Sequence, residues 1–272
     1  MTWVESLFGV RGKTVLVTGG SRGIGELIAE AFVRAGAKVY ITARKEAQCV
    51  ATAKRLGDLG FCEALPADLS NPDAIRGLAA ALHAQTPALH VLINNAGIAW
   101  GAPLEEYPLE AWDKVFSINV RAVFQLTRDL LPMLRAVATP ADPARVINLG
   151  SIAGSRVAKD TFAYAYGASK AAVHHLTAML AMELTGSHIT VNAVAPGVFP
   201  SRMTAMRIGD STMLELASAG TPLQRAGTIE DVGGTCLYLA SRSGAYVTGA
   251  VIPLDGGQHT QALPWRADDA SA

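Results

Sequence analysis

The sequence predicts a single-domain α/β fold in which helices cover both faces of a seven-stranded, mostly parallel sheet. Three observations lead to this prediction. Short apolar runs rich in valine and isoleucine alternate with longer segments of helical period, which is typical of repeated strand–helix units. The short runs are continuously apolar, as expected of strands that are covered on both faces. No linker, low-complexity tract or internal repeat divides the 272 residues, so we expect one domain over 1–272 with peripheral ends at 1–12 and 258–272.

The individual elements follow from these apolar runs and from the helical segments between them. The expected strands, in order, are 13–18 (KTVLVT), 38–43 (KVYITA), 61–67, 89–94 (LHVLIN), 144–150 (ARVINLG), 189–195 (ITVNAVA) and 249–254. Helices are expected at 24–35, 72–85, 109–136, 161–185 and 229–240. The last helix follows Thr228 and opens with Glu230 and Asp231, which suits a capped N-terminus.

Composition argues against several classes of protein. Half of the residues are apolar and only 17% are charged, unlike a disordered chain. The 23 basic residues balance 23 acidic ones, so we expect neither nucleic acid nor a membrane surface as a partner. The sequence contains no run of 18 apolar residues and no signal-like N-terminus, and we expect a cytoplasmic protein.

The three cysteines, Cys49, Cys62 and Cys236, lie far apart in the sequence. Their number and spacing match neither a disulfide framework nor the paired ligands of a metal site. We therefore expect buried thiols in a reducing compartment and no bound metal.

Glycine makes up about 10% of the chain (26 of 272 residues), above the ordinary share of about 7%. Several of these glycines lie in the run TGGSRGIG, from Thr18 to Gly25, between the first strand and the first helix. Glycines permit close approach of the backbone to a pyrophosphate, which the amides of a helix N-terminus then stabilise. An ordinary turn is the alternative. We interpret the loop as a dinucleotide phosphate site formed by Gly19, Ser21, Arg22, Gly23, Ile24 and Gly25.

The end of the second strand favours NADP(H) over NAD(H). An acidic residue there would bind the ribose hydroxyls of NAD, but the position holds Ala43, followed by Arg44 and Lys45. Arg44 and Arg22 can donate charge-assisted hydrogen bonds to a 2′-phosphate. The alternative is that both arginines are solvated surface residues.

Polar and small residues end the third and fourth strands. Asp68 can accept a hydrogen bond from an adenine amino group or cap the helix near Pro72, and the sequence does not decide between these roles. The fourth strand ends in Asn94-Asn95-Ala96-Gly97, whose small residues would let the backbone run close to the adenine ribose. The paired amides can also tie adjacent strand ends together, and an ordinary turn is the alternative.

Tyr166 and Lys170 are four residues apart in a helical segment, so their polar groups can face one cleft. A tyrosine with a pKa near 10 is a poor acid–base catalyst at neutral pH, and a neighbouring ammonium lowers that pKa. Tyr164 lacks such a partner because Ala168 occupies the position four residues later.

Ser151 ends the fifth strand, at the edge where open α/β sheets bind ligands. Its hydroxyl can donate to a carbonyl oxygen on which negative charge develops, and we prefer it to Ser155, which lies past the strand end. Asn119 is a polar residue among apolar neighbours in a helix. A helix bend backed by a water is one interpretation, and such a water could also connect Lys170 to bulk solvent.

Together these motifs resemble a classical short-chain dehydrogenase/reductase, in order and over nearly the whole chain. The residues that carry the resemblance are 18–25, 94–97, Asn119, Ser151, 166–170, Pro196-Gly197 and Asp255-Gly256-Gly257. The resemblance implies a Rossmann fold and a dimer or tetramer built on the helices that carry Asn119 and Tyr166.

The same resemblance implies the role of each site residue. Tyr166 would be the general acid–base, and Lys170 would lower its pKa and hold the nicotinamide ribose. Ser151 would polarise the carbonyl, and Asn119 would anchor a proton-relay water. Further contacts with the cofactor are implied for Asp68, Leu69, Asn95, Ala96, Gly97, Tyr166, Lys170, Pro196, Gly197 and Phe199.

The segments AYAYGASK, FPSRMT and GAYVTGAVIPLDGG resemble bacterial 3-oxoacyl thioester reductases. This resemblance, and not composition, implies NADPH-dependent reduction of a 3-oxoacyl thioester, with the acyl carrier protein as a candidate partner. One alternative is an enzyme that acts on a sugar, a polyol or another secondary alcohol. The other is a non-catalytic NADP(H)-binding regulator, which the intact catalytic residues disfavour. The gap of 15 residues from Ser151 to Tyr166 is slightly longer than usual in the family and bears on the substrate.

Two further features have an ordinary interpretation beside a functional one. The segment after Phe199 carries Met203, Met206 and Met213. These methionines indicate either a flexible apolar segment that could close over the nicotinamide or an ordinary packed helix. The predicted helix over 109–136 carries Arg121, Arg128 and Arg135 at intervals of seven residues. These arginines could form a binding surface for a carrier protein, but a solvated helix face or an oligomer contact is the simpler interpretation.

Overall fold

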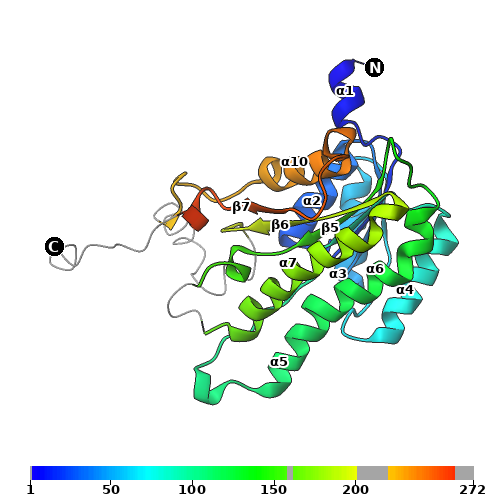
Figure 1. The fold of residues 1–272 in the computed structure, drawn as a ribbon. Helices are drawn as coiled ribbons and strands as arrows, with labels where there is room; N and C mark the ends of the chain where they lie inside the picture. The colour runs from blue at the N-terminus through cyan, green and yellow to red at the C-terminus, as the bar shows by residue number, and fades with distance from the viewer. Residues whose placement is uncertain (1, 158–161, 201–219, 261–272) are drawn as a thin grey trace.

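Seven parallel strands form one sheet in the order β3-β2-β1-β4-β5-β6-β7 (Figure 1). The computed structural model describes residues 2–157, 162–200 and 220–260. Its strands are β1 (Thr14–Thr18), β2 (Lys38–Thr42), β3 (Cys62–Ala64), β4 (Val91–Asn94), β5 (Ala144–Leu149), β6 (Ile189–Pro196) and β7 (Val251–Leu254). Each of the six described strand pairings is parallel, which confirms the predicted fold class.

Helices cover both faces of this sheet (Figure 1). One face carries α2 (Gly23–Arg34), α3 (Glu46–Gly57) and α10 (Ile229–Ala240), and the other carries α4 (Pro72–Gln85), α6 (Ala122–Arg135) and α7 (Tyr164–Leu184). Successive strand residues enter the two cores in turn: Val15 and Val17 of β1 join the first, and Leu16 joins the second. Burial on both faces explains why the strands read as continuous apolar runs.

The helices differ from the prediction in three places. The predicted helix over 109–136 is divided: α5 (Leu109–Phe116) passes into a π-helical turn at Ser117–Arg121, and α6 follows. Two helices were not predicted, α1 (Trp3–Phe8) and α3. The face that α3 buries consists of Cys49, Thr52, Ala53 and Leu56, of which only Leu56 is a large apolar residue, so the sequence carries few of the residues that mark a packed helix.

Other boundaries agree with the prediction within a few residues. The strand expected at 61–67 is shorter, and the helix expected at 161–185 is described from Tyr164. The predicted cap of α10 is present, because the amide of Thr228 donates to Asp231 Oδ2 at 2.8 Å.

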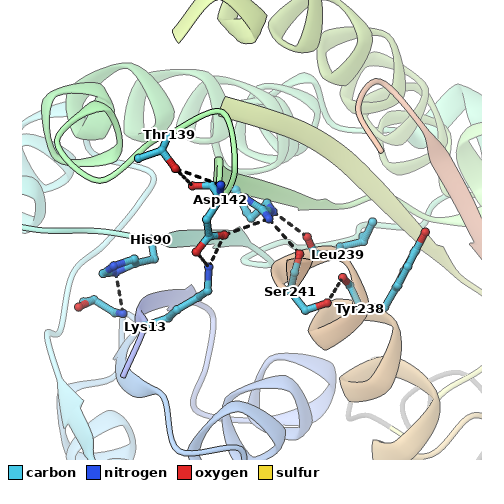
Figure 2. A network of polar contacts seen from close by, with 9 residues as sticks. Lys13, His90, Thr139, Asp142, Tyr238, Leu239 and Ser241 are labelled. Atoms are coloured by element: carbon cyan, nitrogen blue, oxygen red, sulfur yellow. Dashed lines mark hydrogen bonds and ion pairs between the residues drawn. The ribbon is translucent and has the colours of Figure 1, made fainter. Parts of the chain in front are cut away.

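A buried arginine fixes the amino end of β5 to the C-terminus of α10. Arg145 is only 1% exposed, and its Nε and Nη2 donate to the carbonyl oxygens of Leu239 and Ser241 at 3.0 and 2.9 Å. Such carbonyls at a helix C-terminus lack intrahelical partners and attract a cation. Asp142 lies 3.3 Å from Arg145 Nη2 and 2.6 Å from Lys13 Nζ (Figure 2). This network lies at the amino end of β5, whereas the cleft lies at the opposite, carboxyl ends of the strands.

Candidate active site

A cleft of about 430 Å³ lies at the carboxyl ends of the strands, where the strand order reverses between β1 and β4. Open parallel sheets bind their ligands at this switch point, and the volume suits a small molecule or a cofactor. With the exception of Asn119, every residue that the sequence placed in the catalytic or cofactor site lines this cleft. The sequence did not single out several other lining residues, among them Thr42, Gln48, Ile98 and Ile118.

The glycine loop between β1 and α2 requires its glycines for two reasons. Gly19 and Gly23 adopt left-handed backbone conformations, with φ of +64° and +55°. A Cβ on Gly25 would lie 2.2 Å from Asn95 Nδ2 and 2.3 Å from the carbonyl oxygen of Gly19. The loop is therefore packed tightly against the end of β4, and the N-terminus of α2 faces the cleft, where its amides can stabilise an anion.

Hydrogen bonds from Thr18 and Asn95 join β1 to β4 at this edge. Thr18 Oγ1 accepts from the amides of Asn95 and of the following residue, both at 2.9 Å. Asn95 Nδ2 donates to the carbonyl oxygens of Thr18 and Gly19 at 2.8 and 3.2 Å. Asn94 Nδ2 donates to Asn148 Oδ1 of β5 at 2.9 Å. The paired amides thus tie three adjacent strands together, which was one of the interpretations of this motif.

Basic side chains lie beside the end of β2. Arg22, Arg44 and Lys45 line the same part of the cleft as Thr42. The hydroxyl of Thr42 is buried and has no hydrogen-bond partner in the part of the chain that the structure describes. The three cations form a set of donors that suits a phosphate group.

Asp68 does not cap α4, because Asn71 does so by accepting the first-turn amide at 2.8 Å. Instead, Asp68 Oδ1 accepts from the amide and the hydroxyl of Ser70 at 2.9 and 2.7 Å. Burial opposes ionisation, but these two hydrogen bonds and the charges of Arg44 and Lys114 outweigh it and lower the pKa of Asp68. The cleft therefore contains an ionised carboxylate that can accept from a ligand.

Tyr166 and Lys170 both line the cleft from α7. Lys170 Nζ lies 5.6 Å from the centre of the Tyr166 ring and donates to the carbonyl oxygen of Leu149 at 2.6 Å. Burial lowers the pKa of Lys170 to about 8. Its ammonium therefore remains charged at neutral pH close to the phenol. Tyr164 faces away from this pair, with its ring 5.7 Å from that of Tyr107.

Ser151 lies two residues after the end of β5 and is buried at the wall of the cleft. Its Oγ accepts from the amide of Ala153 at 3.2 Å, so the hydroxyl keeps its own hydrogen for donation. Ser155 is exposed, lies outside the cleft lining and donates to the carbonyl oxygen of Ile152 at 3.4 Å. The geometry therefore favours Ser151 over Ser155 as the group that meets a ligand.

Asn119 lies behind the cleft wall, in the π-helical turn between α5 and α6. Its Oδ1 accepts from the amide of Ile98 at 2.9 Å, and its Nδ2 donates to the carbonyl oxygen of Ile98 and to Ser169 Oγ at 3.0 and 2.9 Å. A Cβ on Gly97 would lie 3.3 Å from Asn119 Oδ1 and 3.7 Å from Lys170 Nζ. Asn119 therefore joins the segment after β4 to α7, and a water relay to Lys170 stays a prediction.

The turn after β6 completes the cleft. Pro196, Gly197 and Phe199 line it, and the Phe199 ring is packed so closely on Gly227 that a Cβ there would lie 2.2 Å from Cζ. A Cβ on Gly197 would lie 2.7 Å from Asp255 Cβ. The Pro-Gly and Asp-Gly-Gly motifs of the sequence therefore pack against each other.

The remaining predicted features lie outside the cleft. Cys49 and Cys236 are buried as predicted, whereas Cys62, in the edge strand β3, is only partly buried. Burial raises the pKa of Cys49 to about 11 and those of Cys62 and Cys236 to about 12, so all three are protonated, unpaired thiols. Among the described residues, no group of three or more His, Cys, Asp or Glu side chains could hold a metal ion. None of the helices in the described ranges is both long and apolar enough to span a bilayer.

The regularly spaced arginines on α6 and just before it all have partners within the chain. Arg121 donates to the carbonyl oxygen of Ser70, Arg128 pairs with Asp129, and Arg135 donates to Ser187 Oγ. The methionine-rich segment with Met203, Met206 and Met213 lies outside the described residues.

Comparison with known proteins supplies relatives over most of the chain. A family model described as enoyl-(acyl carrier protein) reductase matches residues 19–259. The rhamnolipids biosynthesis 3-oxoacyl-[acyl-carrier-protein] reductase of Pseudomonas aeruginosa is 51% identical over 252 residues, covering 93% of this chain and 98% of the relative. Galactitol 2-dehydrogenase of Cereibacter sphaeroides is 34% identical over 253 residues, covering 93% and 97%.

Solved structures give the same picture. The active-site complex of Pseudomonas aeruginosa RhlG with NADP matches with a TM-score of 0.90 at 50% identity, covering 93% of this chain and 99% of that chain. A gluconate 5-dehydrogenase of Burkholderia cenocepacia in complex with NADP and tartrate matches with a TM-score of 0.87 at 26% identity, covering 95% and 100%.

The buried Lys170 predicts a pH dependence of stability. Because its pKa falls from 10.5 to about 8 on folding, the unfolded chain binds more protons than the folded chain between these values. The contribution of Lys170 to the free energy of unfolding therefore rises above pH 8, by at most ~1.4 kcal/mol per pH unit. In urea unfolding of the ligand-free protein, the difference between the wild type and Lys170→Met should change in favour of the wild type by about 1 kcal/mol from pH 8 to pH 9. Lys54→Met, at an exposed position of α3, controls for the loss of a charge, and a pH-independent difference for Lys170→Met would contradict this account.

Proposed function

Because the chain belongs to the short-chain dehydrogenase/reductase family, we propose that it reduces a 3-oxoacyl thioester to the 3-hydroxyacyl thioester with NADPH. One observation carries the proposal: Ser151, Tyr166 and Lys170 line the same cleft as the glycine loop and the basic end of β2. The site can therefore place a carbonyl group and a dinucleotide side by side.

The residues of the cleft fit NADP(H). The glycine loop lies so close to Asn95 that a Cβ on Gly25 would collide with the Asn95 side chain. Because the loop is built of glycines, its backbone and not a side chain would face the pyrophosphate. Arg22 and Arg44 would hold the 2′-phosphate, since no acidic residue ends β2 to repel it. The ionised Asp68 would accept from the adenine amino group.

The side chains divide the chemistry of carbonyl reduction among them. When bound, the nicotinamide supplies a hydride to the carbonyl carbon of the substrate. Ser151 donates a hydrogen bond to the carbonyl oxygen and stabilises the negative charge that develops there. Tyr166 transfers its hydroxyl proton to the same oxygen and completes the alcohol. The ammonium of Lys170, 5.6 Å from the tyrosine ring, favours the phenolate that remains.

Exposed apolar side chains in the segments before the catalytic helix and after β4 favour an acyl substrate over a sugar. Leu104 and Val157 are 66% and 95% exposed, and Trp100 and Phe162 are also exposed. The amide of Ala102 donates to the carbonyl oxygen of Phe162 at 3.2 Å, which joins the two segments next to the start of α7. An acyl chain would remove this apolar surface from water, whereas the hydroxyl groups of a polyol would find few partners on it.

The domain extent, the compartment, the carrier of the substrate and the oligomeric state also form part of the proposal. We treat residues 1–272 as one NADP(H)-binding domain of a cytoplasmic enzyme, and three unpaired thiols agree with a reducing compartment. The acyl carrier protein named for the Pseudomonas aeruginosa relative is the proposed carrier of the substrate. A dimer or tetramer would form through α6 and α7, whose Phe124, Met179 and Met182 are exposed.

Substrate preference is tested by following NADPH oxidation with a panel of carbonyl compounds. We expect turnover of acetoacetyl thioester and a kcat/KM that rises with acyl chain length, because each buried methylene contributes about 0.8 kcal/mol. Simple sugars and diketones serve as comparison substrates. Turnover of a sugar or a diketone together with no turnover of any thioester would contradict the proposed substrate.

Cofactor preference is tested by Arg44→Asp. Loss of a charge-assisted hydrogen bond, worth about 1.5 to 3 kcal/mol, should raise the KM for NADPH roughly 10- to 100-fold and leave the KM for NADH unchanged or lower. Arg76→Asp removes an exposed arginine of α4, outside the cleft lining, and should alter neither constant. Equal increases in both constants with Arg44→Asp would show that this arginine does not recognise the 2′-phosphate.

A further inference from the structure

His174 packs directly behind the catalytic serine. It lies on α7 one turn after Lys170, and its Nε2 accepts from the amide of Ser151 at 3.5 Å. A Cβ on Gly150 would lie 2.3 Å from Nε2, and a Cβ on Gly154 would lie 2.8 Å from Cε1. The imidazole thus occupies the space that side chains on both sides of Ser151 would need.

The two glycines are explained by the close approach of this ring, and at Gly154 also of the α7 backbone, and not by their own backbone conformation. Neither Gly150 nor Gly154 has a positive φ, so any L-residue could adopt their dihedral angles. At Gly154 the backbone of α7 also comes close, with the carbonyl carbon of Lys170 2.7 Å from the position of a Cβ. The segment around Ser151 is therefore shaped to let α7 and its histidine approach.

The same surroundings select the protonation state of the ring. Burial lowers the pKa of His174, and the nearby charge of Lys170 lowers it further. The imidazole is therefore neutral at physiological pH. Because Nε2 accepts from Ser151, the ring proton belongs on Nδ1.

We propose that His174 is a positioning residue: as a neutral imidazole that accepts the Ser151 amide, it holds the segment after β5 and thereby places the Ser151 hydroxyl against the substrate carbonyl. The inference rests on the proposed role of Ser151 in carbonyl reduction. His174 itself does not line the cleft, so it acts through Ser151 and not through contact with a ligand.

Two variants separate positioning from packing. His174→Gln keeps an acceptor at the place of Nε2, whereas His174→Leu fills similar volume without one. We expect kcat to fall about 10- to 100-fold in His174→Leu, because a small misplacement of a catalytic group has an effect of this size. His174→Gln should stay within a few-fold of the wild type, and the NADPH Kd should be unchanged in both variants. Similar losses of kcat in the two variants would mean that the ring only fills space.

A double-variant experiment tests whether His174 acts through Ser151. In a Ser151→Ala background, His174→Leu should lower kcat by less than about threefold, because the group it positions is already absent. Losses that multiply would overturn the proposal. Every variant is assayed with a carbonyl that the wild type reduces, so an error in the proposed substrate class is seen in the wild type and is distinguished from an error about His174.

The state of the ring gives a readout that does not depend on turnover. ¹⁵N NMR of the histidines, with His174 assigned by the His174→Gln variant, should show a neutral ring protonated on Nδ1 at pH 7. A ring protonated on Nε2, or on both nitrogens, at this pH would overturn the proposal even if no carbonyl substrate were turned over.

Discussion

The hydrogen bonds between Thr18 and Asn95 hold the junction on which the whole site depends. β4 lies beside β1 and not beside β3, so the chain leaves the sheet in opposite directions on the two sides of this junction. The cleft opens there, and the Asn95 amide that bonds to β1 also contacts the glycine loop through the carbonyl oxygen of Gly19. One set of short contacts therefore sets the distance between the phosphate-binding loop and the end of β4. Arg145 secures the opposite edge of the same sheet, where it caps α10.

The second constraint is the close approach of α7 to the end of β5. Tyr166, Lys170 and His174 follow one another at intervals of four residues, so a single stripe of the helix faces β5 and Ser151. Lys170 reaches back to the carbonyl oxygen of Leu149, which ties the helix to the strand and compensates part of the cost of burying its ammonium. The charge near the tyrosine and the location of the serine hydroxyl are thus consequences of one packing contact. Substitutions that separate α7 from β5 should disturb both together.

Much of this could be predicted from the sequence because the signals are local. Buried parallel strands are continuous apolar runs, and residues at strand ends and at helix positions i and i+4 have predictable directions. The signals that failed depend on tertiary contacts. α3 buries only one large apolar residue, Leu56, and the π-helical turn at Asn119 has no sequence signature. The sequence left the role of Asp68 open, and the structure shows its carboxylate bonded to Ser70 and not to the end of α4. Gly150 and Gly154 are indistinguishable in sequence from phosphate-loop glycines, and only the structure shows that the His174 ring, together with the α7 backbone at Gly154, requires them.

The central claim is that Tyr166 delivers the proton in a carbonyl reduction carried out in this cleft. It is tested most directly by Tyr166→Phe, with kcat measured under saturating NADPH and the NADPH Kd measured by fluorescence titration. We expect kcat to fall roughly 100- to 10,000-fold, the range of general acid–base catalysis, with a Kd close to that of the wild type. A variant that keeps the wild-type kcat would contradict the account, because the proton would then come from another group.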